Sequence, residues 1–137
     1  MGKLAHLMFT VPPQLLKFTG PDVPKDIRLN AARGVLPLSP KDLVTAVYAL
    51  TRDPDEEIKN LARETLVNMP PALTRPALSD PAIHPLILDF FARNLAQESE
   101  SQEIIALNKA ADDDTIAFQA GLTNKKLVDI ISNNQIR

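Results

Sequence analysis

The stretch from residue 50 to residue 66, LTRDPDEEIKNLARETL, places its apolar side chains at the spacing of an α-helix. These side chains follow an i, i+3, i+4, i+8 pattern: Ile58, Leu61, Ala62 and Leu66. The positions between them are polar or charged: Lys59, Asn60, Arg63 and Glu64. An apolar stripe of this period predicts an amphipathic helix that buries one face.

The same stretch carries the signals of a helix start. Asp53 can accept a backbone N–H as the N-cap, and Pro54 loses no hydrogen bond at the first helical position. Glu56 stands at the capping-box spacing from Asp53, and its charge suits the positive end of the helix dipole. The sequence therefore predicts that this helix begins at Pro54.

Further segments show the helical period. A helix is predicted at residues 39–50, where Ser39 and Pro40 mark its start. Another helix is predicted at residues 100–109. Residues 123–132 give a helix that closes the chain. No segment shows the sustained alternation of a strand. The predicted fold class is therefore all-α.

Residues 83–95 also carry an apolar stripe, but the start of this helix is open. A helix that begins at Pro81 would contain Pro85 in its interior, where proline removes a hydrogen bond. The alternative is a start near His84, with residues 80–84 as a turn. The sequence does not decide between the two starts.

A repeat runs through the chain. The dipeptide Ala-Leu recurs at about 28-residue spacing, and an aspartate-bearing turn follows each copy. A helical pair of that length cannot bury its apolar face alone, so successive units must stack on a shared core. We expect one domain, a short α-solenoid of stacked antiparallel helical hairpins, with approximate units at residues 12–36, 39–68, 70–96 and 100–121 and a terminal helix at 123–134.

Two segments agree in character when they are aligned on an aspartate: DVPKDIRLNA at residues 22–31 and DPDEEIKNLA at residues 53–62. Each has isoleucine, a basic residue and alanine at the same distances after the aspartate. This pattern resembles the HEAT repeat, an α-solenoid unit of two antiparallel helices.

The resemblance implies a ladder of acidic and basic side chains between stacked units. It would use Asp22 with Arg28, and Asp53 with Lys59. The later units keep the aspartate and lack the basic residue, at Asp80 and Asp113. The charged ladder is therefore expected to fade toward the C-terminus.

Composition narrows the classes of function. The net charge of −2 over 137 residues lacks the basic excess that phosphate-backbone binding needs, so no nucleic-acid partner is expected. The absence of cysteine excludes thiol nucleophiles, thiolate metal sites and disulfides. The four glycines are not grouped, which excludes the usual phosphate-binding loops.

Metal binding and catalysis have no good candidates in the sequence. Asp112, Asp113 and Asp114 are consecutive, so their side chains point apart, and we expect them to cap a helix near residues 115–120. His6 and His84 have no second ligand at metal-binding spacing. We therefore expect no metal, no cofactor and no enzymatic activity.

No stretch approaches the roughly 18 continuous apolar residues that a membrane-spanning helix needs. The N-terminal apolar run is broken by His6 and has no cleavage pattern after it, so we expect no signal peptide. The expected location is cytoplasmic, without a membrane partner.

The dipeptide Ala-Arg recurs in the second helix of successive units, with its arginines at Arg33, Arg63 and Arg93. Together with Arg28 and Lys59 these residues give two interpretations: a solvated helix face, or a basic stripe that binds a partner protein. Arginine is favoured at interfaces because its planar fork binds a carboxylate at two points.

These features predict a non-catalytic protein–protein interaction or scaffold module. The alternative is a HEAT-like nucleic-acid-binding or base-repair protein, which would need a basic surface and stacking aromatics. A degenerate enzyme would need a closed pocket with buried ionisable groups. The last predicted helix has no second helix to pair with, so it either caps the stack or belongs to a longer protein or to a homodimer formed through the C-terminal helix.

Overall fold

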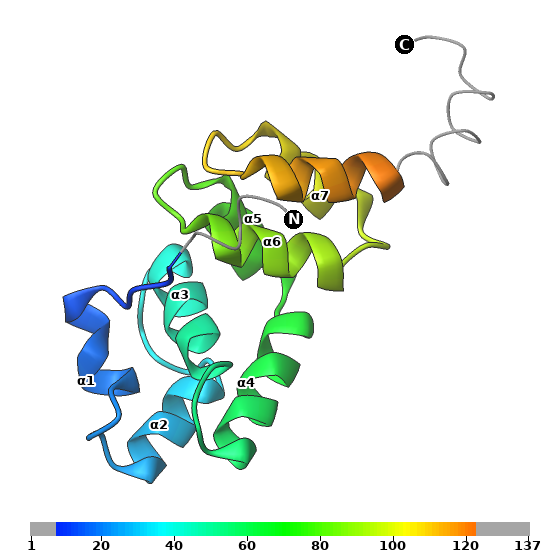
Figure 1. The fold of residues 1–137 in the computed structure, drawn as a ribbon. Coiled ribbons are helices and arrows are strands. Elements are labelled where there is room, and N and C mark those ends of the chain that lie inside the picture. The colour runs from blue at the N-terminus through cyan, green and yellow to red at the C-terminus, as the bar shows by residue number, and fades with distance from the viewer. Residues whose placement is uncertain (1–7, 123–137) are drawn as a thin grey trace, which may run out of the picture.

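The computed structural model describes residues 8–122 of the chain. Within this range every regular element is a helix, which confirms the all-α class (Figure 1). The elements are the 3-10 helix η2 (Pro13–Leu15) and the α-helices α1 (Leu16–Thr19), α2 (Lys25–Ala32), α3 (Pro40–Leu50), α4 (Glu56–Val67), α5 (Pro71–Ser79), α6 (Pro85–Asn94) and α7 (Ser99–Leu107), followed by a helical stretch at residues 113–122. The predicted helix at residues 123–134 lies outside the described residues.

Local cap chemistry explains two predicted helix starts. The Ser39 hydroxyl accepts a hydrogen bond from the Asp42 N–H at 3.3 Å and Pro40 occupies the first position, so α3 begins as predicted. Helix α6 begins at Pro85 with His84 as its N-cap. The structure therefore selects the later of the two starts, because Pro85 needs no N–H there.

The predicted start of α4 is wrong. The helix begins at Glu56, and its N-cap is Asp55, whose side chain accepts hydrogen bonds from the N–H groups of Glu57 and Ile58. Asp53 instead lies in the interior, where it pairs with Arg28. The buried ion pair thus removes Asp53 from the helix end, and no capping box forms from Asp53 and Glu56.

Helix α2 ends at a glycine in the left-handed region. Gly34 has φ of 74°, a conformation that glycine adopts without steric cost. A Cβ atom at this position would lie 3.1 Å from the Thr65 methyl carbon. Glycine therefore both ends α2 and lets that end approach α4.

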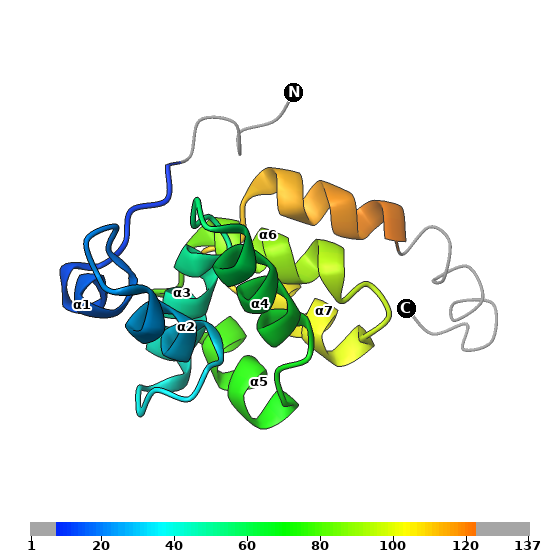
Figure 2. The same ribbon diagram turned by 90° about the horizontal axis from the view of Figure 1, so that it is seen from below.

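The helices contact one another in an alternating pattern. Helix α3 contacts α1 and α5, and α5 contacts α7, so α1, α3, α5 and α7 follow one another in contact. Helices α2 and α4 are likewise in contact, and the view from below in Figure 2 has both on its near side. The predicted ranges 39–68 and 70–96 each enclose two consecutive helices.

One continuous cluster of buried apolar side chains runs from α2 to α7. Most of helix α3 is buried, as expected for a helix that is apolar on nearly all sides and has neighbours around it. The cluster includes Ala31 and Ala32 of α2 and Ile105 of α7. Helices α2 to α7 therefore contribute to one shared core.

Candidate functional site

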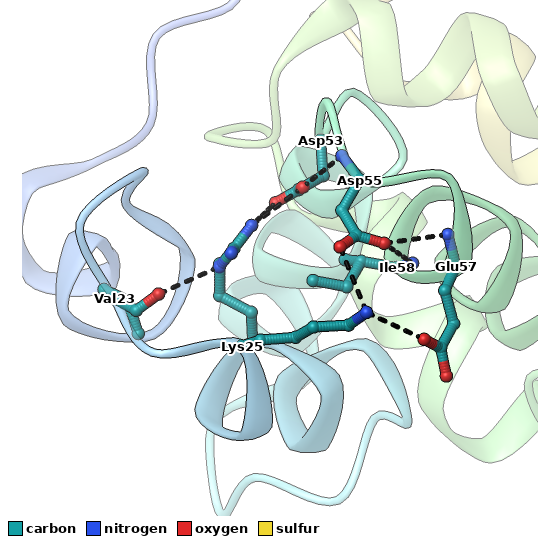
Figure 3. Close-up of polar contacts among 7 residues, drawn as sticks. Val23, Lys25, Asp53, Asp55, Glu57 and Ile58 are labelled. Atoms are coloured by element: carbon teal, nitrogen blue, oxygen red, sulfur yellow. Dashed lines mark hydrogen bonds and ion pairs between the residues drawn. The ribbon is translucent and has the colours of Figure 1, made fainter.

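A buried ion pair joins α2 to the loop before α4. Arg28 Nη1 lies 2.8 Å from Asp53 Oδ1 and 2.7 Å from Asp53 Oδ2, and its Nε donates to the carbonyl of Val23 at 3.0 Å (Figure 3). The side chains of Arg28 and Asp53 are only 14% and 4% exposed. Asp53 Oδ1 also accepts a hydrogen bond from the Asp55 N–H at 2.8 Å. Arg28 therefore has a structural role within the fold, and little of its side chain remains exposed to a partner.

A second, more exposed ion-pair group lies beside the first. Lys25 Nζ lies 3.2 Å from Asp55 and 2.9 Å from Glu57, at the start of α4 (Figure 3). Hydrogen bonds to Glu57 and Asp55 raise the pKa of Lys25. The hydrogen bond from Lys25, together with those from the N–H groups of Ile58 and Glu57, lowers the pKa of Asp55. Both groups therefore favour their charged forms.

The pairing expected from the HEAT resemblance differs from the pairing in the structure. Arg28 pairs with Asp53 of the following helical pair, not with Asp22, which is exposed. Lys59 pairs with Glu56 on its own helix at 2.8 Å, not with Asp53. In place of the pairs Asp22 with Arg28 and Asp53 with Lys59, the structure has one ion pair between Arg28 of α2 and Asp53 in the loop before α4.

The later aspartates have roles in loops. Asp80 accepts a hydrogen bond from the Ala82 N–H at 2.8 Å, while its carbonyl accepts from Asn108 Nδ2 at 3.0 Å. Asp112 accepts from the Asp114 N–H at 3.1 Å, just before the helical stretch at 113–122. The expected cap thus involves Asp112, and Asp113 is exposed.

The three arginines of the Ala-Arg dipeptides lie in different surroundings. Arg33, at the end of α2, donates to Asn30 Oδ1 at 2.8 Å and borders an open pocket shared with the end of α4. Arg93 donates from Nε to Asp89 at 2.8 Å, and its guanidinium lies over the Phe118 ring at 4.6 Å. Both side chains are exposed but already have a polar partner.

Arg63 differs from these arginines. It is exposed on α4, and its guanidinium lies 5.7 Å from the centre of the Phe90 ring on α6. Among the ion pairs formed within residues 8–122, none involves Arg63. Of the five basic residues selected from the sequence, Arg33 and Arg63 have no carboxylate partner within residues 8–122, and Arg63 is the one that lies beside an aromatic ring of another helix.

An aromatic row that sequence reasoning missed lies next to Arg63. The Phe9 and Tyr48 ring centres are 4.9 Å apart, and those of Tyr48 and Phe90 are 5.9 Å apart, both in edge-to-face geometry. At the other end of the row the Arg52 guanidinium lies over Phe9 at 5.9 Å. The three rings are far apart in the sequence, so no local pattern indicates that they meet.

His84 holds the N-terminal segment against this row. Its Nδ1 accepts from the Leu86 N–H at 3.0 Å, and its Nε2 lies 3.0 Å from the carbonyl oxygen of Met8. The acceptor role of Nδ1 places the imidazole proton on Nε2, which donates to Met8. His84 therefore caps α6 and fixes Met8 and Phe9 at the same time.

Two other features, a metal-binding cluster and a membrane-spanning helix, are absent from the described residues. Residues 8–122 bring together no group of three or more histidine, aspartate or glutamate side chains that could share a metal ion. Within the same range, no helix has both the length and the apolar character needed to cross a membrane. Neither a protein-family model, nor a curated protein, nor a solved structure matches the chain.

Proposed function

We propose that the chain is a non-catalytic protein–protein interaction module built as a short, HEAT-like α-solenoid. Contacts between alternate helices support the architecture, because α1, α3, α5 and α7 follow one another in contact. The Arg28–Asp53 pair supports it as well, since it links one helical pair to the next. In a stack of this kind the outer side chains of neighbouring helices form an extended binding surface.

The proposed function rests on one observation: Arg63 is exposed and forms no ion pair within residues 8–122. Arg28 and Lys25 of α2 are both used in ion pairs. Arg63 instead is presented on α4 beside an aromatic side chain of α6, with no carboxylate from residues 8–122 in an ion pair with it. Arginine beside aromatic residues is the composition enriched at protein interfaces.

Affinity capture from a lysate of the native cells tests this function. The wild-type chain should recover a specific partner protein, and Arg63→Glu should recover much less of it because the substitution reverses the charge at the interface. Lys109→Glu is the control, since Lys109 is an exposed cation just after α7 that belongs to neither α4 nor α6. Salt-sensitive recovery of nucleic acid without a protein would replace the proposal with the nucleic-acid-binding alternative.

A further inference from the structure

Two arginines flank the aromatic row on the surface formed by the N-terminal segment, α3, α4 and α6. We define the arginine–aromatic surface as Phe9, Tyr48, Arg52, Arg63 and Phe90. Arg52 lies over the first ring of the row and Arg63 over the last. Both arginines are exposed, whereas Phe9 and Phe90 are half-buried and Tyr48 is buried.

These two guanidinium groups form no ion pair within residues 8–122. Arg28, Arg75 and Arg93 each pair with a carboxylate, and Arg33, which has no carboxylate partner there either, donates to Asn30 at 2.8 Å. Arg52 has only a long hydrogen bond of 3.5 Å to the Tyr48 hydroxyl. A guanidinium carries five N–H donors, so most of those on Arg52 and Arg63 remain open to a partner.

The rings beneath these arginines prepare them for binding. A guanidinium that lies over an aromatic face is held by the ring while the N–H groups at its edge stay accessible. The side chain is then partly ordered before a partner arrives, which lowers the entropy lost on binding. The rings themselves are fixed by edge-to-face contacts with Tyr48 and His84.

The chemistry of the surface favours carboxylates over nucleobases. Arginine edges bind a carboxylate at two points, and two arginines at opposite ends of an apolar row fit two carboxylates with an apolar group between them. Base stacking needs a free ring face, but guanidinium groups lie over Phe9 and Phe90, and Tyr48 is only 7% exposed. Met8, 82% exposed beside Phe9, adds apolar contact area.

We propose that the arginine–aromatic surface binds an acidic protein segment in which two carboxylates flank an apolar residue, one meeting Arg52 and the other Arg63. The inference rests on the proposed interaction function and names its partner class. The apolar residue between the carboxylates lies against Phe9 and Phe90. Binding is therefore both salt-sensitive and dependent on the apolar residue.

Fluorescence anisotropy with defined peptides tests the proposal. The probes are labelled peptides in which two glutamates are separated by apolar spacers of increasing length, each with a glutamine counterpart. One spacer length should bind best, and its glutamine counterpart should bind at least about tenfold more weakly because charge-assisted hydrogen bonds are lost. Arg52→Gln and Arg63→Gln should each weaken binding of the best peptide by about tenfold.

Two further variants separate this surface from general charge and folding effects. Arg93→Gln removes an exposed arginine that already pairs with Asp89, so it should change peptide affinity less than about twofold. Arg63→Lys keeps the charge without the planar fork and should bind with intermediate affinity. Circular dichroism spectra that match the wild type show that the variants are folded.

Several outcomes would overturn the proposal. Equal affinity for the glutamate and glutamine peptides would contradict it. So would a loss of peptide affinity in Arg93→Gln as large as the loss in Arg52→Gln and Arg63→Gln. Tighter binding of single-stranded RNA, or a dimer that Arg63→Gln dissociates while no peptide binds, would assign the surface to another occupant. If a captured protein partner is unaffected by Arg52→Gln and Arg63→Gln, the interaction function stands and this surface is wrong. If neither partner nor peptide binds, both proposals fail.

Discussion

Asp53 lies in a loop, yet its side chain is among the least exposed polar groups of the described chain. A buried carboxylate is tolerated only when charges and hydrogen bonds satisfy it, and here Arg28 and the Asp55 N–H do so. The pair joins α2 to the loop before α4, and α3 separates the two in sequence. Its energetic role should therefore exceed that of the surface ion pairs.

Arg28→Met tests that role. It leaves the Asp53 carboxylate buried without its counter-ion, and we expect the free energy of unfolding to fall by about 3 kcal/mol. Lys59→Met is the control, because the exposed pair of Lys59 with Glu56 should contribute less than about 1 kcal/mol. Urea unfolding followed by circular dichroism measures both. Equal effects of the two substitutions would contradict the special role of Arg28.

Asp55 adds a pH-dependent contribution to stability. Its pKa is lowered from the ordinary value of 3.8, first by Lys25 and then by the helix N–H groups of Ile58 and Glu57. The folded state therefore binds this proton less tightly than the unfolded state, and the contribution is full above 3.8 and lost as the pH falls through the lowered pKa.

Asp55→Asn isolates the charge, because asparagine can still cap α4. We expect the variant to be less stable than the wild type at neutral pH and the difference to shrink in acid. Urea unfolding at a series of pH values measures the difference, with the exposed Glu103→Gln as control. A difference that stays constant from neutral pH into strong acid would rule out the ion-pair origin.

At the scale of elements, α6 depends on an uncommon cap. The His84 imidazole accepts from the Leu86 N–H and also holds the Met8 carbonyl. His84→Ala removes both bonds, and we expect it to cost about 1 kcal/mol or more. His84→Asn restores a cap for α6 and should recover part of that loss. Hydrogen exchange of the first amides of α6 measures the cap directly; unchanged exchange in His84→Ala would show that the cap contributes nothing.

The helices at residues 39–50, 83–95 and 100–109 could be predicted because their signals are local. Ser39 with Pro40 fixes the start of α3, and the placement of Pro85 explains why α6 begins where it does. The start of α4 could not be predicted in this way, since it depends on Arg28 reaching Asp53 from another helix.

The candidate site was only partly predictable for the same reason. Arg63 stands out as a repeated basic residue on a helix face, but Arg52 belongs to no repeat. The aromatic row brings together Phe9 of the N-terminal segment, Tyr48 of α3 and Phe90 of α6. Such contacts depend on how the helices pack against one another, and no short-range pattern in a single sequence indicates that packing.

At the scale of the whole molecule, polar side chains tie the later helices together much as Arg28 ties the earlier ones. Asn108 Nδ2, at the end of α7, donates to the carbonyls of Leu78 and Asp80. These two carbonyls at the end of α5 thereby gain hydrogen-bond donors from α7. Gln102 donates to the carbonyls of Ala92 and Leu95 at the end of α6. Links between near neighbours of this kind suit a stack in which stability is a sum of local interfaces.

Matched leucine truncations distinguish such a stack from a bundle around one central core. Leu15 and Leu78 are both almost fully buried, but Leu15 lies at the start of the described chain and Leu78 lies in α5, inside the continuous core. Each Leu→Ala change should cost about 3 kcal/mol at its own interface. If each helix is stabilised only by the helices it contacts, Leu15→Ala should speed hydrogen exchange in α1 and α2 and leave α6 and α7 protected. Leu78→Ala should instead speed hydrogen exchange in α3, α5 and α7 together. Native-state hydrogen exchange followed by mass spectrometry measures this pattern. Uniform loss of protection in every helix of Leu15→Ala would mean that the chain unfolds as one unit and that the stacked-layer architecture is wrong.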